Sequence, residues 1–102
     1  MTNKNERIGA HVLAEMLNDY GITHIFYTPC LAVNMLAAME DLGTNRIITH
    51  GEKAAAYMAD GFARIAGRPA VCMSQHIGGS NIAAGLRDAY MAGSPVITLA
   101  GS

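Results

Sequence analysis

Residues 50–64 read His50-Gly51-Glu52-Lys53-Ala54-Ala55-Ala56-Tyr57-Met58-Ala59-Asp60-Gly61-Phe62-Ala63-Arg64, a segment of mostly small side chains with one acid at its start. The small-residue pattern continues to Ala66 and predicts a helix over about residues 52–66, which Gly67 ends. A short apolar run, predicted as a strand over residues 46–49, comes directly before it. Glu52 therefore opens a helix that follows a strand, and most of the side chains after it are small.

The rest of the chain alternates in the same way. Apolar residues recur at helical spacing between Ile8 and Tyr20 and between Val33 and Leu42. Strands are predicted over residues 22–27, 69–75 and 95–100, and a further helix over residues 80–91. Strands that alternate with helices imply right-handed crossovers, so we expect an α/β fold with a doubly wound parallel sheet and helices on both faces. No repeat or linker divides residues 1–102, which predicts a single domain.

Composition excludes several classes of protein. The chain has 102 residues, is 51% hydrophobic and carries a net charge of −1. Seven Lys and Arg against eight Asp and Glu, without charged runs, argue against nucleic acid as a partner. No apolar run approaches the roughly 20 residues that span a bilayer. Cys30 and Cys72 lie in or beside apolar segments and the N-terminus has no secretory signal, so we expect a cytoplasmic location.

Three loops are predicted at one edge of the sheet. Ligands of open α/β sheets bind outside the carboxyl ends of the strands, where the chain places Thr28-Pro29-Cys30, His50-Gly51-Glu52 and Gln75-His76-Ile77-Gly78-Gly79-Ser80-Asn81. Neither G-x-G-x-x-G nor G-x-x-x-x-G-K-[ST] occurs, although the glycines at 78 and 79 could expose amides to an anion or form an ordinary turn. Four histidines without a second ligand at metal spacing predict no metal site.

Glu52 has two interpretations. Acids are favoured in the first turn of helices by the macrodipole, which alone could explain its position. The small residues of its helix, however, would let a partner surface approach closely, and a carboxyl at such an interface would be partly desolvated. Such a carboxyl could share a proton with a nitrogen of a flat ligand.

A longer motif resembles a known family. It reads His50-Gly51-Glu52-x-Ala54-Ala55-Ala56-x-Met58-Ala59-x-Gly61-Phe62-Ala63-Arg64-x-x-Gly67-x-Pro69. This motif resembles the pyrimidine-binding (PYR) domain of thiamine-diphosphate-dependent enzymes, in particular the acetolactate synthase, benzoylformate decarboxylase and pyruvate oxidase group. The resemblance runs from about Arg7 to Ser102 and implies a PYR-type fold, incomplete here, with residues 1–102 as the N-terminal part of a PYR domain.

The resemblance also implies roles for residues. In the family, the glutamate at the position of Glu52 binds the pyrimidine ring nitrogen of thiamine diphosphate and activates the cofactor. Benzoylformate decarboxylase has a histidine on the loop that matches His76, which makes His76 a candidate acid/base. The expected cofactor contacts are Glu52, Pro29, Cys30, Gln75, Gly78 and Asn81. Asn81 is also expected to cap the fourth helix. Asp60, Arg64 and Asp88 are expected to be solvated or paired on helix surfaces.

The family's diphosphate and Mg²⁺ are bound by a separate domain, whose Gly-Asp-Gly…Asn motif is absent from this chain. We therefore expect part of a longer protein, inactive alone, whose active site forms between PYR and diphosphate-binding domains of a homo-oligomer. The expected substrate is a 2-oxo acid or acyl compound, which is decarboxylated or joined to another molecule. Two alternatives stay open: a non-catalytic α/β domain that uses the small-residue helix for subunit association, and a flavodoxin-like domain that binds a ligand at residues 78–80.

Overall fold

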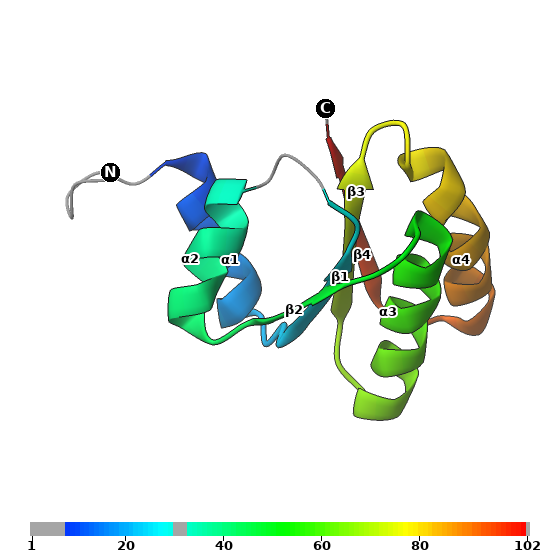
Figure 1. The fold of residues 1–102 in the computed structure, drawn as a ribbon. Coiled ribbons are helices and arrows are strands. Elements are labelled where there is room, and N and C mark those ends of the chain that lie inside the picture. The colour runs from blue at the N-terminus through cyan, green and yellow to red at the C-terminus, as the bar shows by residue number, and fades with distance from the viewer. Residues whose placement is uncertain (1–7, 30–32, 102) are drawn as a thin grey trace.

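A computed structural model describes residues 8–29 and 33–101. Helices and strands alternate in the predicted order (Figure 1). The elements are α1 (Gly9–Asp19), β1 (His24–Tyr27), α2 (Val33–Leu42), β2 (Asn45–Ile48), α3 (Glu52–Ala66), β3 (Ala70–Gln75), α4 (Gly79–Ala92) and β4 (Val96–Gly101). The helix predicted at residues 52–66 has the predicted bounds, and it ends where Gly67 adopts a left-handed conformation with φ of 67°.

The four strands form one parallel sheet in the order β2-β1-β3-β4. The chain passes from β1 outward to β2, and then returns across β1 to place β3 on its other side. The strand order therefore reverses between β1 and β3, at the point where doubly wound sheets leave a crevice for ligands.

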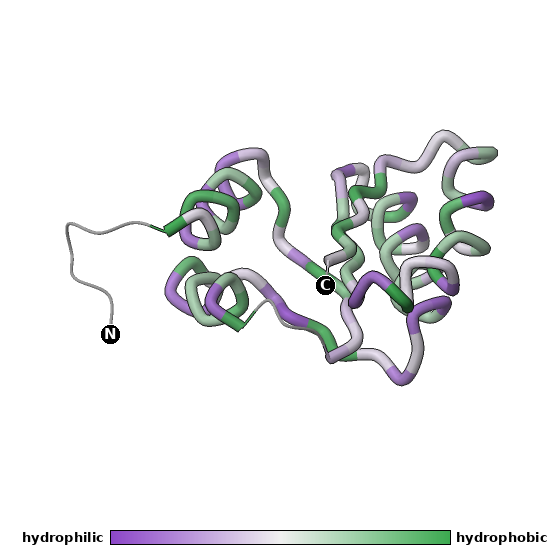
Figure 2. Tube along the Cα trace, turned by 90° about the horizontal axis from the view of Figure 1, so that it is seen from above, coloured by the Kyte–Doolittle hydropathy of each residue, from purple (hydrophilic) through white to green (hydrophobic). Residues whose placement is uncertain are grey.

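Helices cover both faces of the sheet, as predicted. α1 and α2 lie on one face, and α3 and α4 lie on the other (Figure 1; Figure 2 views these layers from above). The side chains of neighbouring strand residues alternate between the faces: Ile25 belongs to the apolar cluster under α1 and α2, and Phe26 to the cluster under α3 and α4. β1 and β3 contribute to both clusters, so the two central strands hold the layers together.

The small residues of α3 pack inside the chain. Four of them, Ala55, Ala56, Ala59 and Ala63, are buried in the cluster formed with β1, β3 and α4. A Cβ added at Gly85 of α4 would lie 2.4 Å from the Cβ of Ala56, so α3 and α4 cross at a contact that admits no larger side chain. The chain's own sheet and α4 therefore cover these four alanines, whereas Ala54, Gly61 and Ala66 on the same helix are exposed.

No helix within residues 8–29 and 33–101 has the length and apolar character to cross a membrane.

Candidate functional site

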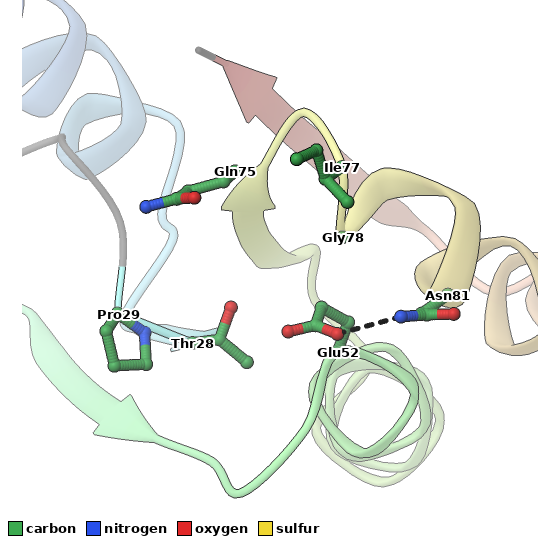
Figure 3. A pocket seen from close by; sticks show the side chains of 7 residues that line it. All are labelled: Thr28, Pro29, Glu52, Gln75, Ile77, Gly78 and Asn81. Carbon is green, nitrogen blue, oxygen red and sulfur yellow. Dashed lines mark hydrogen bonds between the residues drawn. The ribbon is translucent and has the colours of Figure 1, made fainter.

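A pocket of about 260 Å³ opens at the carboxyl edge of the sheet, at the reversal of strand order between β1 and β3. Its wall is made by residues from all three of the predicted loops (Figure 3). The lining residues are Thr28, Pro29, Glu52, Gln75, Ile77, Gly78 and Asn81. We call this the edge pocket. Its volume is slightly below the range of about 300–1,000 Å³ that holds whole ligands of drug size, which suits a site that encloses one ring of a larger molecule.

Thr49 fixes the turn between β2 and α3, and this turn places Glu52 in the edge pocket. Its backbone N–H donates to the carbonyl of Tyr27 at 2.8 Å, which extends the pairing with β1 one residue past the end of β2. Its hydroxyl donates to the carbonyl of Gly51 at 2.8 Å. Thr49 is buried, so these bonds are shielded from water and fix where α3 begins.

The carboxylate of Glu52 is held by one neighbour. The Nδ2 of Asn81 donates a hydrogen bond of 3.0 Å to Oε1 of Glu52, and the other carboxylate oxygen points towards Thr28 (Figure 3). The expectation that Asn81 caps the fourth helix is wrong. α4 begins two residues earlier, at Gly79, with Gly78 as its N-cap residue and no side-chain capping bond. Asn81 therefore lies inside the first turn, where its side chain is directed across to α3.

Gly78 lies against the stem of the same glutamate. A Cβ added there would lie 2.6 Å from Cγ and 2.9 Å from Cδ of Glu52, and 3.2 Å from Cβ of Ser74. The missing side chain at position 78 thus makes the space that Glu52 occupies. A carboxylate in that space repels anions, so the alternative of a flavodoxin-like site at residues 78–80 loses support.

Of the residues predicted to contact a cofactor, the structure brings Pro29, Glu52, Gln75, Gly78 and Asn81 together in the edge pocket. Cys30 lies outside the described residues. Sequence reasoning quoted Thr28 and Ile77 within the loops but did not single them out, although the alignment of strand ends could have pointed to Thr28.

The two histidines in the loops at the sheet edge, His50 and His76, lie outside the edge pocket. Both are exposed. The backbone N–H of His76 donates to the carbonyl of Gly101 at 2.8 Å, which fixes the end of β3 to β4. A catalytic role for His76 stays a prediction. Among the residues that the structure describes, no group of three or more His, Cys, Asp or Glu side chains could hold a metal ion.

Comparison with known proteins identifies the family. Residues 7–102 match the family described as "Thiamine pyrophosphate enzyme, N-terminal TPP binding domain". The chain belongs to this thiamine pyrophosphate enzyme family. It is 35% identical over 96 residues to the acetolactate synthase of Bacillus subtilis (strain 168), and 34% identical over 96 residues to the acetolactate synthase large subunit of Buchnera aphidicola subsp. Acyrthosiphon pisum (strain APS).

A solved structure agrees with this membership of the thiamine pyrophosphate enzymes. The X-ray structure of a Mycobacterium smegmatis protein, described as a thiamin diphosphate-dependent enzyme, superposes with a TM-score of 0.78 at 29% identity and covers 95% of this chain. The chain spans 17% of the length of each of the two relatives above and 19% of that solved chain. The matched region of each protein is therefore a small part of its whole.

The edge pocket fits the pyrimidine end of the family's cofactor. Its one acid, Glu52, has an oxygen directed away from Asn81, so it can meet a ring nitrogen. Pro29 and Ile77 offer apolar surface for the faces of a flat ring. None of the described residues that line the edge pocket is a Lys or Arg that could bind a diphosphate group. The donor set thus suits a neutral heteroaromatic ring better than a phosphate.

Proposed function

We propose that this chain is the pyrimidine-binding part of a thiamine-diphosphate-dependent enzyme that cleaves or joins 2-oxo acids, as an acetolactate synthase does. The observation that carries the proposal is Glu52 at the start of α3, inside the edge pocket, with one carboxylate oxygen held by Asn81. When bound, thiamine diphosphate supplies a stabilised carbanion for chemistry at a carbonyl carbon. The residues of this chain bind the pyrimidine ring, orient it and exchange one proton with it.

Glu52 carries the proton exchange. Its carboxyl shares a proton with the pyrimidine ring nitrogen at the oxygen that Asn81 does not hold. Thr28 and Gly78, both buried, line the pocket beside it and limit the entry of water. Pro29 and Ile77 orient the ring through apolar contact. Because Glu52 is the first residue of α3 and Gly78 the N-cap residue of α4, two packed helices support the carboxylate when the ligand arrives.

A second domain completes the proposed site. The diphosphate and its Mg²⁺ are held by a diphosphate-binding domain, which is supplied by the same protein or by a partner chain in a homo-oligomer. Support comes from the relatives, which are about six times as long as the matched region. A 2-oxo acid is the proposed substrate class because two of these relatives are named acetolactate synthases. We propose a cytoplasmic location, in line with the unpaired thiol of Cys72.

His76 is proposed as a proton carrier for the substrate, after Glu52 has served the cofactor. It lies next to Gln75, which lines the edge pocket, and it is exposed at the edge where the second domain would approach. Imidazole exchanges protons near neutral pH, which suits that role.

The decisive experiment replaces Glu52 in the full-length protein. Glu52→Gln keeps the size of the side chain and removes its ability to exchange a proton, so we expect kcat to fall by about 10²–10⁴-fold. The control is Glu40→Gln on the exposed surface of α2, which we expect to leave kcat unchanged. Wild-type turnover by Glu52→Gln would overturn the proposal and favour the non-catalytic alternative.

A further inference from the structure

We propose that Asn81 and Gly78 are positioning residues that together select the direction of the Glu52 carboxylate, so that one oxygen is held and the other is presented to the ligand. The inference rests on the proposed function and deepens it. Both residues come from α4 or the loop before it, whereas Glu52 belongs to α3, so the site depends on how these two elements meet.

Asn81 contributes a donor that does not titrate. An amide NH₂ can only donate, and a carboxylate oxygen accepts, so the bond of 3.0 Å fixes which oxygen of Glu52 is occupied. The bond joins residues that are 29 positions apart in the chain. A carboxylate without this partner could turn about its terminal torsion, which has broad and shallow minima. The amide therefore removes a rotation that would cost entropy when the ring binds.

Gly78 contributes space. Its φ of −69° and ψ of −15° are accessible to every amino acid, so backbone conformation does not require glycine here. The requirement comes from contact, because a Cβ would lie 2.6 Å from Cγ of Glu52. A methyl group at position 78 would displace the stem of Glu52 and break the alignment with Asn81.

The competing explanation is that the Asn81–Glu52 bond only ties α4 to α3. The two helices already meet closely at Gly85 and Ala56, which does not depend on Asn81. Asn81 is exposed, and exposed polar pairs contribute little to stability. A structural role therefore predicts lost stability with normal cofactor activation, and a positioning role predicts the reverse.

The test uses the full-length protein with Asn81→Leu, which removes the donor at similar size, and Gly78→Ala. Asn18→Leu, exposed on α1 across the sheet, and Gly61→Ala, exposed on α3, are the matched controls. The readouts are the exchange rate of the thiazolium carbon-bound proton of bound thiamine diphosphate in D₂O, the Tm of the protein without cofactor, and the crystal structure of cofactor-free Gly78→Ala.

We expect proton exchange to slow by about ten-fold or more in Asn81→Leu and Gly78→Ala, since both substitutions would move the Glu52 carboxylate out of line with the ring nitrogen. Asn81→Gln, which keeps the amide, should recover part of the rate. The Tm of cofactor-free Asn81→Leu should match that of Asn18→Leu, and Glu52 should be displaced in the Gly78→Ala crystal structure.

Two outcomes would overturn the inference. The first is wild-type exchange in Asn81→Leu and Gly78→Ala while Glu52→Gln is slow, which leaves the proposed function intact. The second is normal exchange with a lowered Tm, which assigns the bond to stability alone. If Glu52→Gln itself exchanges at the wild-type rate, the proposed function fails as well.

Discussion

Asp60 is a buried acid whose partner reaches it from the next turn of α3. The guanidinium of Arg64 makes two hydrogen bonds of 2.9 Å to its carboxylate, and these bonds lower the pKa of Asp60. Of the two expected states, solvated or paired, the structure shows pairing, but the expected position of Asp60 on a helix surface is wrong because its side chain is buried. Sequence alone shows the spacing of four residues, but not which side of the helix meets the core.

This pair makes stability depend on pH. Asp60→Asn should lower the free energy of unfolding at pH 7 by about 1 kcal/mol, because Arg64 is half-exposed and partly screened. A lowered folded-state pKa stabilises the protein above the unfolded value of about 3.9 and loses that effect as pH falls through the folded value. The difference between wild type and variant in urea unfolding should therefore shrink below about pH 4. The exposed Asp41→Asn is the control, and a difference that is constant down to pH 2 would contradict the prediction.

Cys72 gives a second test at a single residue. Its side chain is fully buried in β3, and burial raises the pKa of its thiol. Since the thiolate is the reactive form, we expect iodoacetamide to modify Cys72 in the native protein at least about 100-fold more slowly than in urea. Peptide mass spectrometry locates the modification. Rapid native labelling of Cys72 would show that β3 opens readily.

At the scale of elements, α3 and α4 are set by their closest contact. In Gly85→Ala the new Cβ would overlap Ala56, so we expect a loss of about 1–3 kcal/mol in the free energy of unfolding, even though alanine favours helix. Gly61→Ala is the matched control. It lies in α3 with open space around it and should gain about 0.5–1 kcal/mol. Equal changes in the free energy of unfolding for Gly85→Ala and Gly61→Ala would contradict a close contact between α3 and α4 at Gly85.

The elements themselves were largely readable from the sequence. Periodicity and the glycines after each helix predict the alternation and the bounds of α3, because both depend on local conformation. The contact of Asn81 with Glu52 could not be predicted from the sequence. An asparagine near a helix start resembles a cap, and only the long-range packing of α4 against α3 shows that it meets Glu52.

At the scale of the whole molecule, the sheet order predicts where the fold is most resistant to opening. β1 and β3 lie between other strands and join both apolar clusters, whereas β2 lies at an edge. We expect amide hydrogens in β1 and β3 to exchange slowest and to report global unfolding, with faster exchange in β2. Hydrogen exchange followed by mass spectrometry measures this. Protection in β2 equal to that in β3 would contradict the prediction.

The close contact between Gly85 and Ala56 also affects the geometry of the edge pocket. Ala56 follows Glu52 by four residues on α3, and Gly85 follows Asn81 by four residues on α4. The same two helix faces thus meet twice, one turn apart, first at the hydrogen bond and then at the crossing. The spacing between the helices at Gly85 and Ala56 therefore sets the distance between Asn81 and Glu52 one turn away. A wider side chain at position 85 would push the helices apart and lengthen the Asn81–Glu52 bond, so we expect a substitution there to change the direction of the Glu52 carboxylate although Gly85 does not line the edge pocket.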